Sequence, residues 1–215
     1  MKRKELLLSF CVLLAFTLFT LLVRARLFVN YDLATTVRIE NHMPYGLDTP
    51  FSIFSILGSA EVISLCLLPI FLIYKWRSLI IFFSYAFGLF VEVVGKTFLD
   101  HPGPPHVFFR NDIDFKFPSN YIQTEHSYPS GHSYRTVFVI YVWVIILLLS
   151  KRSRNFKIAL TLCAILFCGI MLTSRVSLGE HWTTDVIGGS LLGLGFASAS
   201  SAFTHKSDKI VKPKK

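Results

Sequence analysis

The sequence is poor in charged side chains. Asp, Glu, Lys and Arg make up 16% of its 215 residues, whereas hydrophobic residues make up 53%, and the mean hydropathy is +0.54. A soluble domain of this length has too small a core to bury so much apolar surface. The scarcity of charge therefore excludes an ordinary soluble protein and indicates that most of the chain faces lipid.

Acidic residues are scarcer than basic ones: 13 Asp and Glu stand against 22 Lys and Arg, for a net charge of +9. Such an excess can indicate nucleic-acid binding. Here, however, the basic residues form short clusters between apolar runs and do not cover a polar domain. We therefore attribute the positive charge to membrane topology and expect no nucleic acid among the partners.

Cysteine is also rare, and its placement excludes a disulfide framework. The four cysteines all lie inside apolar runs without CxxC spacing, at Cys11, Cys66, Cys163 and Cys168. None stands in a polar loop where a disulfide or a metal site could assemble. Nothing else in the sequence resembles a cluster of metal ligands, so we expect neither a metal nor another cofactor.

What the sequence does contain is long apolar runs. Six of them are long enough to cross a membrane: Leu6–Val23, Phe51–Tyr74, Leu79–Phe98, Ser133–Leu149, Phe156–Thr173 and Trp182–Phe203. The lack of two-residue alternation indicates helices rather than barrel strands. A cleavable signal peptide is the alternative for the first run, but no small-residue cleavage site follows it. We predict an all-α fold, a six-span transmembrane helical bundle that forms one domain over residues 1–215.

The positions of Lys and Arg predict the orientation of this bundle. With the N-terminus in the cytoplasm, fourteen of the 22 basic residues fall on the inner side, including those of the tail 204–215. This excess follows the positive-inside rule, although Arg24, Arg26 and Arg38 are exceptions. We predict a multi-pass protein of the plasma membrane with both termini in the cytoplasm. The polar segment Asn30–Asp48 fits an amphipathic helix at the outer interface or a plain loop equally well.

Three polar patches interrupt the apolar runs, and the predicted topology places all three on the outer side. The first is Lys96 with the stretch HPGPP at 101–105, the second is PSGH at 129–132, and the third is the segment 174–185. Ionisable groups near a membrane are costly and usually functional. Their convergence at one depth favours a shared site over three unrelated structural features.

The second and third patches contain the residue types that phosphoryl transfer needs. Ser130, Gly131 and His132 stand at a helix start, where free backbone N–H groups attract an anion. His132 could protonate a leaving oxygen. His181 and Asp185 are four residues apart, hence on one helix face, where the carboxylate can orient the imidazole as a nucleophile.

Lys96 and Arg175 add positive charge for phosphate oxygens. Taken singly, these features have structural alternatives. Lys96 could snorkel to the headgroups, Ser130 could serve as a helix cap, and His181 and Asp185 could form a structural hydrogen bond. Their combination favours phosphate chemistry.

These motifs resemble those of a known family. PSGH at 129–132 and SR-x5-H-x3-D at 174–185 are similar to the second and third signature motifs of the type 2 phosphatidic acid phosphatase superfamily, which shares its site with vanadium haloperoxidases and bacterial acid phosphatases. The six-span layout extends the resemblance over most of the chain. The resemblance implies an all-helical, metal-independent phosphatase in which His181 forms a phosphohistidine, Asp185 orients it and His132 is the general acid. It further implies phosphate binding by Lys96, Ser130, Gly131 and Arg175.

The first motif departs from the family pattern. The resemblance requires Arg-Pro after a lysine and six further residues, but counting from Lys96 gives Gly103-Pro104. Losing a charged contact to the transition state costs about 3 kcal/mol. Arg135 is the first candidate to replace the missing arginine, because it follows His132 by three residues on the same helix face. Two weaker candidates are His101 and Arg110.

Together these features predict hydrolysis of a lipid phosphate at the outer membrane face. Candidate substrates are phosphatidic acid, phosphatidylglycerophosphate and polyprenyl diphosphates. A phosphotransferase and a catalytically silent protein that binds lipid phosphates are the alternatives. The aromatic loop Asp100–Tyr128 could select the substrate or form a structural lid. Gly189-xxx-Gly193 predicts close helix packing, more often within a chain than between chains.

Overall fold

The computed structural model describes residues 2–110, 113 and 126–204, and its regular elements are all helices, as the sequence predicts. The helices are, in chain order, α1 (Lys2–Arg24), α2 (Val29–His42), η1 (Tyr45–Leu47), α3 (Asp48–Leu57), α4 (Ala60–Leu65), α5 (Leu68–Tyr74), η2 (Lys75–Arg77), α6 (Ser78–Phe98), η3 (His106–Phe108), α7 (Gly131–Leu149), α8 (Arg154–Ser177) and α9 (Thr183–Thr204). The basic tail from residue 205 and most of the predicted aromatic loop lie outside the described residues.

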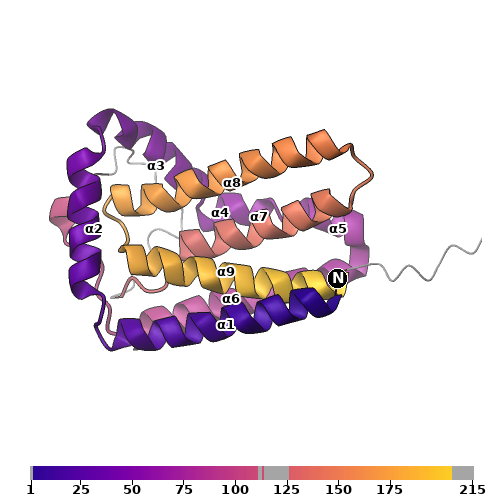
Figure 1. Ribbon diagram of the computed structural model, residues 1–215, viewed down its shortest axis with the longest axis horizontal. Helices are drawn as coiled ribbons and strands as arrows, with labels where there is room; N and C mark the ends of the chain where they lie inside the picture. The colour runs from indigo at the N-terminus through magenta and orange to yellow at the C-terminus, as the bar shows by residue number, and fades with distance from the viewer. Residues whose placement is uncertain (1, 111–112, 114–125, 205–215) are drawn as a thin grey trace, which may run out of the picture.

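The long helices run side by side as a bundle, and α2 crosses one end of it (Figure 1). The N-terminus lies at the opposite end. The C-terminal end of α6, the N-terminal end of α7, the C-terminal end of α8 and the N-terminal end of α9 all point toward α2 (Figure 1). These four ends carry the three polar patches of the sequence, so the fold itself brings the patches to one end of the bundle.

Five stretches of the described chain are long and apolar enough to cross a membrane: α1, Ala60–Phe98, α7, α8 and α9. A multi-pass membrane protein is therefore confirmed. The prediction of one uninterrupted helix over Phe51–Tyr74 is wrong, because α3, α4 and α5 divide that run. The first break falls at Gly58, after which the Ser59 hydroxyl accepts the Val62 N–H at 3.4 Å and starts α4 as its N-cap.

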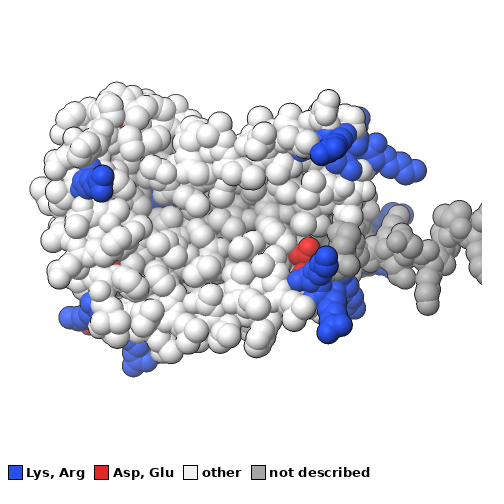
Figure 2. All heavy atoms as spheres, in the orientation of Figure 1, with Lys and Arg blue, Asp and Glu red and all other residues white. Residues whose placement is uncertain are grey.

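The outer surface of the bundle is suited to lipid. Side chains such as Phe83 and Leu72 are 72% and 81% exposed, which water would disfavour and hydrocarbon would not. Figure 2 shows a broad uncharged face, with large groups of Lys and Arg at the end where the N-terminus lies. These large groups lie at the end away from the polar patches, whereas smaller basic groups lie at the end that α2 crosses (Figure 2).

Helix α9 packs closely on α7 because of two glycines. A Cβ added at Gly189 would stand 2.2 Å from the carbonyl oxygen of Ser130, and one added at Gly193 would stand 2.5 Å from that of Tyr134. Real side chains do not fit in such spaces. The predicted glycine pair therefore packs within the chain, and it sets α9 against the start of α7.

Candidate active site

The start of α7 and the start of α9 are joined directly. The Ser130 N–H donates to the backbone oxygen of Asp185 at 3.0 Å. From the same end of the bundle, the charges of Arg175, Arg135 and Lys96 all act on the His132 imidazole. The structure therefore brings the predicted site residues of all three patches into one cluster.

A tight turn between α8 and α9 brings Arg175 next to His181. The His181 N–H donates to the Arg175 backbone oxygen at 3.1 Å. Gly179 makes this turn possible, with a φ of 68° in the left-handed region that favours glycine. A Cβ there would also stand 1.9 Å from the Phe108 carbonyl oxygen, so the turn lies directly against the preceding loop.

His181 and Asp185 form a buried pair. Nδ1 of His181 lies 3.3 Å from Oδ2 of Asp185, and the same oxygen accepts the Trp182 N–H at 2.9 Å. Asp185 is fully buried and His181 is 9% exposed. With Nδ1 turned to the carboxylate, the other ring nitrogen, Nε2, is left for attack on a phosphorus atom.

Burial lowers the pKa of His181, and the positive charges of Arg175 and Lys96 lower it further. The Asp185 carboxylate opposes this shift without reversing it. The imidazole is therefore neutral at neutral pH, which is the form that can act as a nucleophile.

Arg175 is buried at 1% exposure and contacts two side chains from different parts of the chain. Its guanidinium donates to the Ser55 hydroxyl on α3 and pairs with the Glu180 carboxylate in the turn before His181. Its Nε is buried and has no hydrogen-bond partner in the described part of the protein. A buried donor without a partner is costly, and an anion in the site would satisfy it.

Lys96 and Arg135 share one carboxylate, that of Glu92 on α6. Oε1 of Glu92 lies 3.0 Å from Nζ of Lys96, and Oε2 lies 3.2 Å from Nη1 of Arg135. Nε of Arg135, like that of Arg175, is buried without a partner among the described residues. Arg135 therefore lies beside Lys96, a predicted phosphate-binding residue, and its Nε–H is available to donate to an anion.

The start of α7 lies against Glu92. Ser130 is the N-cap of the helix, and its hydroxyl accepts the Ser133 N–H at 3.4 Å. A Cβ on Gly131 would stand 2.0 Å from Oε1 of Glu92. A carboxylate thus reaches the backbone at the glycine of PSGH, in the kind of place where helix starts attract anions.

The other two candidates for the missing arginine lie elsewhere. Arg110 pairs with Asp48 at 2.7 Å and stacks over the ring of Tyr45, 4.3 Å from its centroid, which ties the loop after η3 to the start of α3. His101 contacts the carboxylate that His181 also contacts, with Nε2 3.2 Å from Oδ1 of Asp185.

Sequence reasoning missed several residues that hold the site together. They are Asp32, Ser55, Glu92 and Glu180. Asp32 on α2 accepts the Thr184 N–H at 2.9 Å and the Thr184 hydroxyl at 2.6 Å, so it caps the start of α9. Glu92 did carry a signal, because it is a charged residue in an apolar run, one helical turn before Lys96. Asp32 and Ser55 had no such signal.

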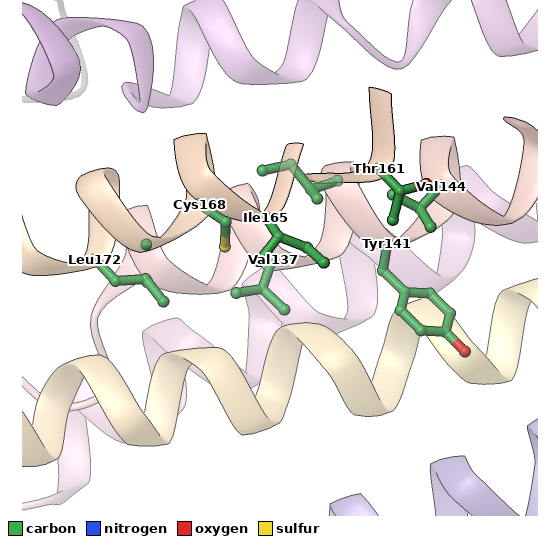
Figure 3. A pocket seen from close by; sticks show the side chains of 9 residues that line it. Val137, Tyr141, Val144, Thr161, Ile165, Cys168 and Leu172 are labelled. Atoms are coloured by element: carbon green, nitrogen blue, oxygen red, sulfur yellow. The ribbon is translucent and has the colours of Figure 1, made fainter. Parts of the chain in front are cut away.

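Two cavities lie near the site, one between two helices of the bundle and one beside α2. One, of about 420 Å³, lies between α7 and α8 and has an apolar lining that includes Val137, Ile165 and Leu172 (Figure 3). The other, of about 450 Å³, is lined by the loop around Gly103 together with α2. No group of three His, Cys, Asp or Glu side chains is placed to hold a metal ion within the described ranges.

Comparison with known proteins gives one family and a fold. Residues 77–209 match the family model described as "PAP2 superfamily". The fold is similar to the crystal structure of "the first transmembrane PAP2 type phosphatidylglycerolphosphate phosphatase from Bacillus subtilis", with a TM-score of 0.72 and 21% identity over 96% of this chain and 99% of that one. It is also similar to LpxE from Aquifex aeolicus, with a TM-score of 0.56 and 23% identity over 78% and 93%. No curated protein matches the chain by sequence.

Proposed function

Because the chain belongs to the PAP2 superfamily, we propose that it is a membrane phosphatase that hydrolyses a lipid phosphate through a phosphohistidine on His181. The match confirms the family predicted from the motifs. One observation carries the proposal: the buried His181–Asp185 pair stands next to Arg175, in the cluster where Arg175, Arg135 and Lys96 all act on His132.

The proposed reaction has two steps. Nε2 of His181 attacks phosphorus, the bond between phosphorus and the lipid oxygen breaks, and His132 gives its proton to that oxygen. Water then attacks the phosphohistidine while His132 takes up a proton, and inorganic phosphate leaves with His181 restored. Asp185 holds the imidazole in the tautomer that both steps need.

In the proposed phosphate site Arg135 replaces the arginine that the family has at Gly103. Two observations support this role: Arg135 shares Glu92 with Lys96, and its Nε is buried without a partner in the described residues, as is that of Arg175. Ser130 and Gly131 at the start of α7 complete the proposed site. Phosphate oxygens would then be stabilised by Lys96, Arg135 and Arg175, with no metal or other cofactor.

The position of the apolar cavity between α7 and α8, one end of which lies close to Arg175, supports a lipid substrate. Leu172, at one end of the cavity, stands one helical turn before Arg175, so a hydrocarbon chain in the cavity could place its phosphate at the site. A Cβ added at Gly169 in the lining meets nothing within 4 Å. We expect Gly169→Phe to raise KM for a long-chain lipid phosphate and to leave KM for a short-chain one unchanged.

We propose a six-pass orientation with both termini in the cytoplasm and the site outside, in the plasma membrane. The basic groups at the N-terminal end support it (Figure 2), and so does the path of the chain, which runs through α5 to that end and returns through α6 (Figure 1). A reporter that fluoresces only in the cytoplasm should therefore be bright when fused after residue 204. If the fusion were dark, the C-terminal end would lie outside and the proposed orientation would be wrong.

The direct test is phosphate release by the purified protein in detergent or vesicles. The panel comprises phosphatidic acid, phosphatidylglycerophosphate and a polyprenyl diphosphate, each also measured with EDTA, beside His181→Ala and the exposed control His106→Ala. We expect release by the wild type and His106→Ala, unaffected by EDTA, and none by His181→Ala. Equal activity of His181→Ala and the wild type would contradict the proposal, and phosphate found on an added alcohol would indicate a phosphotransferase.

A further inference from the structure

Asp185 is shared by two histidines. His181 contacts Oδ2, and His101 from the loop after α6 contacts Oδ1, with Nε2 at 3.2 Å. The two imidazoles are 80 residues apart in the chain and meet on one buried carboxylate. The first histidine has a role in the proposed reaction, whereas the second does not.

The backbone holds His101 firmly in this place. Its carbonyl oxygen accepts both the N–H and the hydroxyl of Ser127, at 3.0 and 3.1 Å. The ring of Tyr128 stands edge-on to the imidazole, with 6.0 Å between the centroids. The Thr184 hydroxyl lies 3.5 Å from Nε2. The backbone of His101 is therefore anchored, and its imidazole packs between Tyr128 and Thr184 beside Asp185.

Three carboxylates among the described residues act on His101, and the one guanidinium in the same cavity lining, that of Arg26, is paired with Asp100. Burial by itself would lower the pKa of His101, but Asp185 on α9, Asp32 on α2 and the adjacent Asp100 together raise it. Burial also raises the pKa of the neighbouring Tyr128 hydroxyl, which stays neutral. His101 therefore stays protonated to a higher pH than an ordinary histidine, and there it carries a positive charge next to Asp185.

His101 also lines the cavity of about 450 Å³ between the loop and α2. Two other residues of that lining, Arg26 and Asp100, form an ion pair whose side chains are 64% and 70% exposed. The cavity thus extends from the surface to the imidazole. Protons can reach His101 from that side without passing through the phosphate site.

We propose that His101 is a positioning residue: in its protonated form it holds Asp185 by the oxygen that His181 leaves free, and so couples the catalytic pair to the pH at this end of the bundle. The inference rests on the proposed function of His181. His101 does not touch the phosphate in this scheme. It acts through Asp185.

The effect of this charge on His181 has a definite sign. Protonated His101 offsets part of the Asp185 charge and disfavours a second positive charge on His181, so it keeps His181 neutral down to a lower pH. Without the charge, Asp185 acts fully on His181 and raises its pKa. The acidic limb of the pH profile of kcat/KM should then move to higher pH.

The experiment compares pH profiles of the wild type with His101→Gln, His101→Lys and the control His106→Gln on one hydrolysed lipid phosphate. Gln keeps a donor at the position of Nε2 without the charge, and Lys keeps the charge. For His101→Gln we expect the acidic limb of the kcat/KM profile to shift to higher pH by about 0.5 to 1 pH unit. Its kcat should fall about tenfold, with KM within about twofold of the wild type. His101→Lys and His106→Gln should keep the wild-type limb.

A His101→Gln limb that coincides with the wild-type limb overturns the proposal, and so does an equal shift in His101→Lys, because the charge would then be irrelevant. If thermal unfolding shows that His101→Gln is misfolded, His101→Asn replaces it as the uncharged variant, and the same shift of the acidic limb to higher pH is expected. If the wild type releases no phosphate from any lipid, the proposed function fails. The same variants are then compared by the pH dependence of stabilisation by orthovanadate, a phosphate analogue that binds neutral imidazole, with the same shift expected.

Discussion

Two buried carboxylates organise this site, and each is shared by two basic side chains. Asp185 lies between His181 and His101, whereas Glu92 lies between Lys96 and Arg135. Imidazoles gain and lose protons near neutral pH, but ammonium and guanidinium groups keep their charge there. The first cluster is therefore suited to moving protons and forming a covalent bond, and the second to holding an anion.

The two carboxylates have different proposed roles. In the proposed reaction Asp185 must remain charged and oriented throughout, since its contact with Nδ1 would set the tautomer of His181. Glu92 pairs with the two cations proposed to bind phosphate, and it lies close to the backbone at Gly131. Changes at Asp185 should therefore appear in kcat, and changes at Glu92 should appear in the binding of phosphate.

The largest effect is expected at Asp185. Asp185→Asn keeps the shape of the side chain but removes the charge that fixes the His181 tautomer, so kcat should fall by about 10³- to 10⁴-fold with little change in KM. Steady-state kinetics on the best lipid substrate measure this. If Asp185→Asn raises KM and leaves kcat unchanged, Asp185 acts in binding, and the proposed difference between the two clusters is wrong.

Next comes Arg135. Arg135→Ala should lower kcat/KM about 100-fold, as much as Arg175→Ala, because both remove a buried guanidinium from the phosphate site. A Cβ on Gly103 makes only ordinary contacts, at 3.5 Å from the Cβ of Ser127, so Gly103→Arg can be made. Adding Gly103→Arg to Arg135→Ala should restore part of the activity. Near-normal activity of Arg135→Ala would reject the hypothesis that Arg135 takes the place of the arginine missing at Gly103.

The smallest effect is expected at Glu92. Glu92→Gln removes the negative charge that competes with phosphate for Lys96 and Arg135, so inorganic phosphate should inhibit about three- to tenfold more strongly. The kcat should change little. Weaker inhibition by phosphate would mean that Glu92 serves to position the two cations, and the proposed competition would be wrong.

Much of this site was predictable from local sequence. His181 and Asp185 are four residues apart, and the contact expected from that spacing is present, although His181 lies in the turn just before α9 and not on the helix itself. The boundaries of α1, α6, α7, α8 and α9 agree with the predicted apolar runs to within a few residues. The run over 51–74 was the exception, because Gly58 and Ser59 start a new helix inside an apolar stretch that hydropathy alone cannot divide.

The rest depended on contacts between distant segments. Nothing near Asp32 indicates that it caps a helix through Thr184, 152 residues later. The polar segment around it was compatible with a helix or a loop, and its helix, α2, turned out to carry this cap. Likewise the sequence offered His101 only as a weaker candidate for the missing arginine, and only the fold shows that it contacts Asp185.

The central claim is that His181 carries the phosphoryl group. Wild-type protein mixed with a radiolabelled lipid phosphate and quenched rapidly in alkali should retain label on a histidine, identified as His181 by peptide mapping. His181→Ala should retain none, and the label should disappear from the wild type at the rate of turnover. Turnover by the wild type without labelled histidine, or labelling that persists in His181→Ala, would contradict the account.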